Sequence, residues 1–339
     1  MSKNTQLAIG YKENLPVTTE NFLVERQVAV PEIGPRDLLV EVAAVSVNPI
    51  DTKVRQNAPA EQLDGFRVLG FDAAGMVKAV GSEVTLFQTG DEVFYTGTLS
   101  RPGTNQRLHA VDERIVGRKP QNLSFADAAA LPLVSITAWE CLFDRLRLTA
   151  ASRGTLLVVG ATGGVGSIVV QLAKALLPQV KIIATASSER AGFMRKLGAT
   201  HTVNHRENLA EQVIAVAPDG VDWIFTSYSP GQAESFAQVI KPAGQIVAID
   251  EVPGDLTAFK AKSVAWLWES MFTRPEFETP DMIEQHRLLN KVASLVEKGQ
   301  ILPIVAETFS PINAANLRQA HILSEKRHTL GKIVLHDWE

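Results

Sequence analysis

One glycine-rich stretch, residues 160–167, constrains the fold of this chain more than any other feature. It follows an apolar, β-prone run at 155–159, which predicts a buried parallel strand, and precedes a stretch with helical spacing at 167–177. A glycine turn between a strand and a helix directs backbone N–H groups and the positive end of the helix dipole at one point. We therefore expect a pyrophosphate to be bound by Ala161, Thr162, Gly163, Gly164, Val165 and Gly166.

Strand and helix signals alternate after this turn. The predicted strands lie at 181–186, 200–204, 221–225 and 245–249, and the predicted helices lie at 189–197, 209–217 and 232–240. Such alternation indicates an α/β fold with a doubly wound parallel sheet. Alanine occupies the first glycine position of the usual G-x-G-x-x-G motif, so the strand–turn–helix context supports dinucleotide binding more than the motif itself does.

The end of the second strand predicts which dinucleotide binds. NAD enzymes normally carry Asp or Glu there, which hydrogen-bonds the adenosine ribose 2′-OH. This chain has Ser187 and Ser188 instead, with Arg190 just beyond. Ser188 can donate to a ribose 2′-phosphate and Arg190 can pair with it, whereas Glu189 is explained by its place at the start of the next helix. The pattern favours NADPH over NADH.

Two further pairs of residues follow predicted strands of the same sheet. Ser227 and Tyr228 come after the strand at 221–225, and Ile249 and Asp250 lie at the end of the strand at 245–249. Ligands of a doubly wound sheet bind at the carboxyl ends of its strands. We therefore expect these four residues to contribute to the cofactor site.

Composition excludes several classes of function. The 339-residue chain has a net charge of −4 and a pI of about 6.0, which gives no electrostatic footprint for nucleic acid. No apolar signal segment begins the chain, and we expect no membrane-spanning run. The single cysteine, Cys141, rules out an internal disulfide framework. A cytoplasmic protein is expected.

The flanking parts of the chain predict a second, mostly β domain. Short strands such as 38–46 and 74–80 are separated by Gly, Pro and Asp turns. Near the C-terminus, helices at 283–297 and 314–324 precede a strand at 331–335, which we assign to this first domain. The expected domains are therefore 1–127 with 275–339, and 128–274.

A split β domain around a doubly wound middle resembles the medium-chain dehydrogenase/reductase superfamily, in particular its zinc-free quinone oxidoreductase branch, the relatives of zeta-crystallin. Within it the chain resembles the subgroup named zinc-type alcohol dehydrogenase-like proteins. The resemblance implies a GroES-like first domain, a Rossmann second domain, a quinone or carbonyl substrate and a homodimer. It is carried by residues 47–55, 69–75, 90–93, 111–120, 129–138 and 279–289.

The residues argue against zinc. Zinc alcohol dehydrogenases have a cysteine near the end of the early strand and Gly-His-Glu soon after, whereas this chain has Ser46 and the sequence Gly-Phe-Asp at 70–72. A structural zinc lobe needs four cysteines, and this chain has one. His201 and His205 are four residues apart, but they lie on a strand running into a loop and share no helical face. We predict no metal site.

The resemblance also assigns candidate site residues. It places Asn48 facing the nicotinamide, where its amide would orient the substrate or the nicotinamide ribose, and Thr137 close to the nicotinamide; a turn residue and a helix cap are the respective alternatives. His205 stands where relatives often have a tyrosine against the 2′-phosphate. Lys53 and Tyr95 are polar candidates on the substrate side, with a solvated lysine and a core aromatic as alternatives.

These patterns together predict an NADPH-dependent, zinc-independent enzyme that transfers a hydride to a quinone or an α,β-unsaturated carbonyl. The alternatives are a zinc-type alcohol dehydrogenase and a non-catalytic, NADPH-binding or redox-sensing protein. Trp266, Trp268 and Phe272 form a predicted aromatic strand, which we interpret as a dimer edge or a cleft wall.

Overall fold

A computed structural model describes residues 5–60, 65–252, 254–326 and 330–339. The chain divides into two compact units, and each is described by itself. Unit 1 comprises residues 1–133 and 272–339, and unit 2 comprises residues 134–271. The first boundary lies six residues later than the sequence indicated, because the short helix α2 (Phe125–Ala129) packs on strands β3 and β5 of unit 1.

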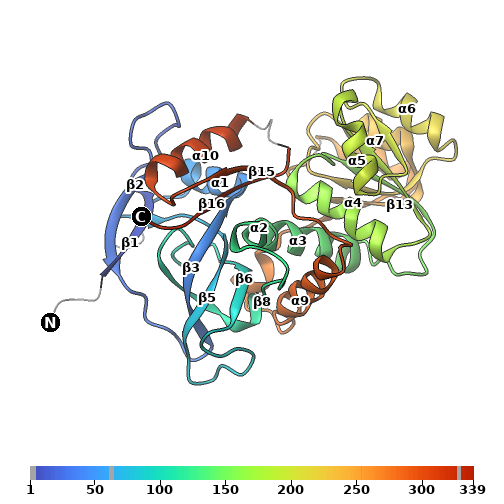
Figure 1. The fold of residues 1–339 in the computed structure, drawn as a ribbon. Coiled ribbons are helices and arrows are strands. Elements are labelled where there is room, and N and C mark those ends of the chain that lie inside the picture. Colours follow the sequence, from blue (N-terminus) through green and yellow to red (C-terminus); the bar gives the residue numbers. More distant parts are fainter. Residues whose placement is uncertain (1–4, 61–64, 253, 327–329) are drawn as a thin grey trace. The chain divides into compact units, whose positions relative to one another are not determined.

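Unit 1 is built on two β-sheets (Figure 1). One has the strand order β2-β1-β4; the other has the order β15-β16-β3-β5-β6-β8, with β7 also paired to β3. The strands are β1 (Thr5–Tyr11), β2 (Val24–Ala29), β3 (Asp37–Val47), β4 (Arg67–Val68), β5 (Asp72–Val80), β6 (Glu92–Thr96), β7 (Leu108–Asp112), β8 (Val116–Arg118), β15 (Val305–Phe309) and β16 (Lys332–His336).

Helices lie between and around these strands. Helix α9 (Glu284–Glu297) ends before Gly299, whose φ of +68° is the left-handed conformation that favours glycine after a helix. The C-terminal strand β16 pairs antiparallel with β3, which confirms its assignment to this unit. The remaining helices of unit 1 are α1 (Pro49–Asn57), η1 (Glu113–Ile115), α8 (Thr273–Glu276) and α10 (Ala314–Lys326).

Unit 2 contains the predicted parallel sheet. Its strand order is β11-β10-β9-β12-β13-β14, and every neighbouring pair is parallel. The strands are β9 (Gly154–Val159), β10 (Val180–Thr185), β11 (His201–Val203), β12 (Val221–Thr226), β13 (Ile240–Ala248) and β14 (Ala265–Trp268). The helices that alternate with them are α4 (Gly164–Leu176), α5 (Ala191–Leu197), α6 (Leu209–Val216) and α7 (Ala233–Val239), with 3-10 turns η3 (Ser188–Arg190) and η4 (Leu256–Lys262).

The core of unit 2 explains why its strands read as continuous apolar runs. Leu157, Ile224 and Ile246, on three adjacent strands, are fully buried in one hydrophobic cluster. A parallel sheet covered on both faces needs apolar side chains on both sides of each strand, so these strands show no alternation with polar residues.

One sequence expectation needs correction. Phe272 is not part of the aromatic strand: β14 ends at Trp268, and Phe272 lies in unit 1, where its ring stands 5.3 Å from that of Phe71. Helix α3 (Pro132–Trp139) begins at a proline, which is tolerated in the first turn because its missing N–H would have no partner in the helix. A π-helical segment, η2 (Glu140–Arg145), follows.

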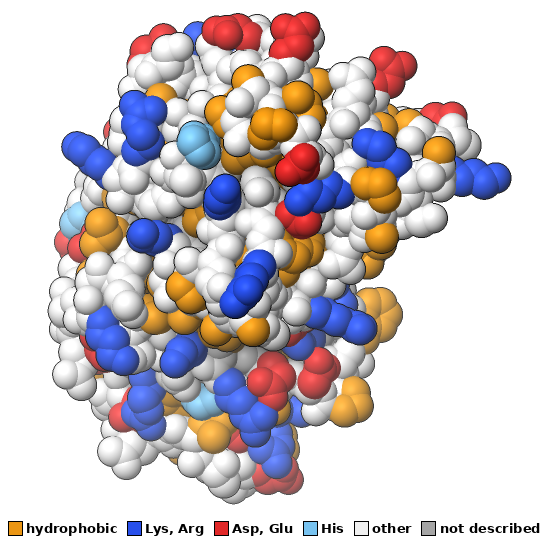
Figure 2. Space-filling model, turned by 90° about the vertical axis from the view of Figure 1, so that its right-hand side faces the viewer, with side chains coloured by type: hydrophobic (Ala, Val, Ile, Leu, Met, Phe, Trp, Pro, Cys, Tyr) orange, Lys and Arg blue, Asp and Glu red, His pale blue; other side chains and the backbone are white. Residues whose placement is uncertain are grey.

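The surface charge and one apolar stretch are relevant to nucleic-acid binding and membrane insertion, which the composition argues against. On the face drawn in Figure 2, basic side chains lie scattered among acidic, hydrophobic and uncharged ones. The 21 residues Phe125–Arg145, which include α2, α3 and η2, are together apolar and long enough to cross a membrane, which the sequence analysis did not expect. In the structure, 78% of its most apolar window is buried, as in the core helix of a folded domain.

Candidate functional site

The glycine turn between β9 and α4 adopts a conformation that depends on glycine. Gly160 has a φ of +75°, and a Cβ added there would lie 2.1 Å from Ser227 Oγ. A Cβ on Gly166 would lie 2.4 Å from the carbonyl oxygen of Gly160. Ala161 is fully buried and packs into the core. The residue that makes the turn possible is therefore Gly160, which the sequence analysis did not count among the cofactor-binding residues.

The N-terminus of α4 is open at its backbone N–H groups. Gly163 is the N-cap residue, and no side chain caps the helix. Ser167 does not do so, because its hydroxyl donates back to the carbonyls of Gly163 (2.6 Å) and Gly164 (3.0 Å). Thr162, Gly163, Gly164 and Val165 are all half-buried. A turn that excludes side chains and leaves helix N–H groups uncapped fits the pyrophosphate of a dinucleotide.

The carboxyl ends of β10 and β11 carry hydroxyl and basic groups. Ser187 is buried, Ser188 is exposed and Arg190 is half-buried. His205, after β11, is exposed, and its pKa is lowered by partial burial and by the guanidinium groups of Arg206 and Arg190. Sequence reasoning missed Arg206. Its position next to the candidate His205 in the sequence could have identified it.

The ends of β12 and β13 form a second part of the same edge. Asp250 accepts hydrogen bonds from the backbone N–H of Ser229 at 2.6 Å and from its hydroxyl at 2.7 Å, so this carboxylate ties the two strand ends together. Ser227 and Ile249 are half-buried, and Tyr228 is 54% exposed. Thr137 is buried in α3. The roles of these residues toward a cofactor stay predictions.

Unit 1 holds a buried polar cluster around Asp72, at the start of β5. Its Oδ1 accepts hydrogen bonds from Thr96 Oγ1 (2.9 Å) and the backbone N–H of Leu133 (2.8 Å). Its Oδ2 accepts hydrogen bonds from Asn48 Nδ2 (2.8 Å) and Lys332 Nζ (3.1 Å). The carboxylate is fully buried, and its four donors include one ammonium group, so it is both neutralised and hydrogen-bonded.

Asn48 is directed into this cluster. Only 1% of the residue is exposed, its amide nitrogen donates to Asp72, and its amide oxygen accepts a hydrogen bond from Lys332. The alternative of a turn residue therefore fits this geometry, and direct contact of the amide with substrate stays a prediction. Sequence reasoning missed Lys332, which lies 284 residues further along the chain.

Asp51, in the first turn of α1, is the second carboxyl of this region. Its Oδ2 accepts a hydrogen bond from the backbone N–H of Asn48 at 2.8 Å. Burial raises the pKa of Asp51 to about 7, although that hydrogen bond and the ammonium of Lys332 act in the opposite direction. The region therefore combines two buried carboxyl groups with one ammonium.

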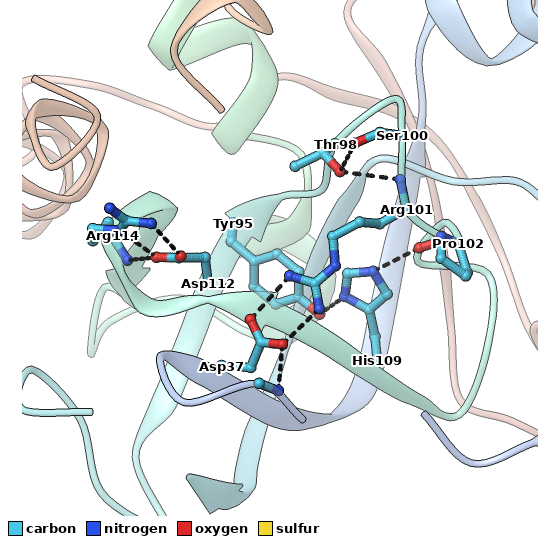
Figure 3. A network of polar contacts seen from close by, with 10 residues as sticks. Asp37, Tyr95, Thr98, Ser100, Arg101, Pro102, His109, Asp112 and Arg114 are labelled. Carbon is cyan, nitrogen blue, oxygen red and sulfur yellow. Dashed lines mark hydrogen bonds and ion pairs between the residues drawn. The ribbon is translucent and has the colours of Figure 1, made fainter. Parts of the chain in front are cut away.

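The two polar candidates on the substrate side lie in different surroundings. Lys53 is exposed on α1, as the solvated alternative describes. Tyr95 is fully buried and stacked on His109, with ring centroids 5.5 Å apart (Figure 3). His109 Nε2 donates to the Pro102 carbonyl (3.0 Å), so Nδ1 accepts from the Tyr95 hydroxyl (3.1 Å). This geometry fits the core-aromatic alternative for Tyr95, and a catalytic role stays untested.

Burial sets the protonation of this pair. It lowers the pKa of His109 to about 4 and raises that of Tyr95 far above its ordinary value. A neutral imidazole and a neutral phenol therefore share one hydrogen bond at neutral pH. Beside them, Arg101 forms two hydrogen bonds to the carboxylate of Asp37, at 2.9 and 2.7 Å (Figure 3). The network stabilises the loop between β6 and β7.

The residues at the zinc positions do not fit a zinc ion. Ser46 offers a buried hydroxyl with no hydrogen-bond partner among the described residues, Phe71 offers an aromatic ring, and all oxygens of Asp72 are engaged. An ammonium, that of Lys332, already lies beside Asp72. Across residues 5–60, 65–252, 254–326 and 330–339, no group of three or more His, Cys, Asp or Glu side chains is arranged to hold a metal ion.

Comparison with known proteins identifies the family. Residues 34–131 match the alcohol dehydrogenase GroES-like domain, and residues 164–273 match the zinc-binding dehydrogenase domain. A zinc-type alcohol dehydrogenase-like protein of Staphylococcus aureus is 39% identical over 336 residues, covering 96% of this chain and 98% of the relative. The chain belongs to the medium-chain dehydrogenase/reductase superfamily.

Other members of the superfamily extend the comparison. An Arabidopsis thaliana protein named NADPH-dependent alkenal/one oxidoreductase is 31% identical over 320 residues, which is 92% of this chain and 75% of that protein. A crystal structure from Rhizobium etli, described as that of a "putative zinc-dependent alcohol dehydrogenase protein", superposes with a TM-score of 0.94 at 45% identity, and the match covers 99% of both chains. This chain is an oxidoreductase of the superfamily, whose members use NAD(P).

Proposed function

We propose that this protein is an NADPH-dependent reductase that transfers a hydride to a quinone or an α,β-unsaturated carbonyl without zinc. The observation that carries the proposal is the carboxyl edge of the unit 2 sheet, where an uncapped glycine turn follows β9 and the ends of the neighbouring strands β10 and β11 carry two serines and two arginines. The turn suits a pyrophosphate, and the strand end suits a ribose 2′-phosphate better than a bare 2′-OH.

The cofactor would supply the hydride, and the protein would bind and orient the cofactor. When bound, the reduced nicotinamide supplies the hydride. Ala161–Gly166 and the N-terminus of α4 would hold the pyrophosphate, and Ser188 and Arg190 the 2′-phosphate. Thr137, Ser227 and Ile249 are the proposed residues nearer the nicotinamide. The Asp72 cluster fixes the start of α1 from the interior of unit 1.

The residues at the zinc-ligand positions indicate the class of acceptor. A simple alcohol dehydrogenase of this superfamily uses zinc to polarise the carbonyl, and the Ser46–Phe71–Asp72 positions do not offer a zinc site. An enone is more readily reduced by hydride because the charge spreads over the conjugated system, and a quinone is a cyclic member of the same class. The 31% identity to the alkenal/one oxidoreductase supports this choice.

NADPH consumption by the purified protein tests the proposal. The acceptors are a small quinone, an enone and an aldehyde, with NADH in parallel and elemental analysis for zinc on the same preparation. We expect turnover of quinone or enone with NADPH preferred and no stoichiometric zinc. Tight NADPH binding without turnover of any acceptor would instead favour a non-catalytic protein, and a zinc-dependent aldehyde activity would favour an alcohol dehydrogenase.

The assembly and compartment are part of the same proposal. β14 is the last strand in the order of the unit 2 sheet, and 54% of Trp268 on that strand is exposed. We propose that this strand forms the edge of a homodimer in the cytoplasm, with no nucleic-acid or membrane partner. Light scattering of the wild type and of Trp268→Glu tests it: a monomeric wild type contradicts the dimer.

A further inference from the structure

The ends of β10 and β11 bring together a set of charged side chains that the glycine turn does not explain. Thr185 pairs with Val203, and the Ala186 N–H donates to the Val203 carbonyl at 2.9 Å, so the segments that follow the two strands are neighbours. One segment carries Glu189 and Arg190, and the other carries His205 and Arg206. The guanidinium groups of Arg190 and Arg206 both act to lower the pKa of Glu189 and the pKa of His205.

Arg206 has a weak partner in this arrangement. Its Nη1 lies 4.0 Å from Glu189 Oε1, with 68% of the Arg206 side chain and 73% of the Glu189 side chain exposed. An exposed pair at this distance contributes little to stability, so the guanidinium is available to a stronger anion. A phosphate monoester, with up to two charges and three acceptor oxygens, binds a guanidinium more strongly than one carboxylate does.

Glu189 competes for the same groups that a ribose phosphate would use. Its carboxylate hydrogen-bonds the Ser187 hydroxyl, which is the first cause of its lowered pKa. The group is therefore ionised at neutral pH, and its charge lies between the serine hydroxyl and Arg206. An arriving phosphate would have to displace it and would be repelled by it.

We propose that Arg206 and Glu189 together set the preference for a phosphorylated adenosine ribose: Arg206 pairs with the 2′-phosphate, and Glu189 is the counter-ion that the phosphate displaces. The inference rests on the proposed function, because it takes the dinucleotide to bind at the glycine turn. It adds a specificity-determining cation and an opposing acid that neither the motif nor the family match assigns.

Binding of nucleotide fragments to the full chain tests the proposal without any turnover. The probes are adenosine 2′,5′-bisphosphate and 5′-AMP, whose dissociation constants are measured by calorimetry for the wild type, Arg206→Ala, Arg206→Lys and Glu189→Gln. Lys196→Ala is the matched control, since Lys196 is an exposed cation on α5. We expect Arg206→Ala to weaken the bisphosphate about tenfold and to leave 5′-AMP within about twofold.

The other variants sharpen the result. Arg206→Lys keeps the charge and should recover part of the loss, and Glu189→Gln should tighten the bisphosphate several-fold without affecting 5′-AMP. Unchanged bisphosphate binding by Arg206→Ala, or equal weakening of both probes, would overturn this inference without contradicting the proposed function. A wild type that binds both probes equally would instead contradict the NADPH preference of the proposed function, and this inference with it.

Discussion

Lys332 Nζ lies 3.1 Å from Asp72 Oδ2, and at most 5% of either side chain is exposed to solvent. The pair joins the strand at the C-terminal end of the chain to β5, which begins 260 residues earlier. Both charges also have neutral hydrogen-bond partners, because Lys332 donates to Asn48 and Asp72 accepts from Thr96. A buried charge left without its partner is strongly unfavourable, so the consequences of breaking this pair are large.

Removing the ammonium should destabilise the protein. We expect Lys332→Met to lower the free energy of unfolding by about 3–5 kcal/mol, because Asp72 then remains buried without a counter-charge. Urea denaturation followed by circular dichroism measures it. Lys326→Met, at an exposed lysine of α10, is the control and should change little. The double variant Lys332→Met/Asp72→Leu should recover part of the loss; no loss in Lys332→Met would contradict the importance of the pair.

Asp51 should make stability depend on pH. Its pKa is raised by burial from the ordinary 3.8 to about 7, so the folded protein keeps a proton that the unfolded chain releases. The contribution of this group to stability is therefore fully present below about pH 4, falls as the pH rises toward 7, and is constant above that. Asp51→Asn should become progressively more stable than the wild type between pH 5 and 8.

Urea denaturation at these two pH values measures the change for Asp51→Asn. The exposed Asp219 provides the control, since Asp219→Asn should show the same stability difference at both pH values. A difference for Asp51→Asn that does not vary with pH would mean that Asp51 is ionised in the folded protein throughout this range.

The conformation of the glycine turn gives a third prediction. Gly160→Ala combines a φ of +75° with a Cβ 2.1 Å from Ser227 Oγ, and it should lower stability by about 1–3 kcal/mol and weaken NADPH binding. Gly192→Ala is the matched control, because Gly192 lies in α5 with no atom within 4 Å of an added Cβ. That change should be neutral or stabilising by about 0.5–1 kcal/mol. Thermal unfolding and NADPH titration compare the two.

Tyr95→Phe separates the two interpretations of this phenol. Loss of its hydroxyl leaves the buried Nδ1 of His109 without a donor, so we expect about 1–3 kcal/mol less stability. Because Tyr95 is fully buried, kcat with the best acceptor should change by less than about threefold. A fall in kcat of about a hundredfold, with the fold intact by circular dichroism, would restore Tyr95 as a proton donor.

Some features of the site could be predicted locally and others could not. The serines and the arginine after β10 follow a strand that the sequence already indicates, so their place at the sheet edge comes from the α/β pattern alone. The meeting of Arg206 with Glu189 depends on β11 pairing beside β10, with Thr202 opposite Ala184. A strand of three residues carries too weak a signal to fix that register.

The sequence by itself determined the parallel sheet of unit 2 and its glycine turn, because apolar runs, helical spacing and a turn glycine act over a few neighbouring residues. It also determined that four cysteines for a structural zinc lobe do not exist. Only the tertiary structure decided that Asn48 and Tyr95 are directed into the interior, and that Lys332 neutralises Asp72. Those outcomes depend on long-range strand pairing, such as that of Ile333 with Val47, which brings together groups hundreds of residues apart. The local sequence pattern around each residue does not indicate such pairing.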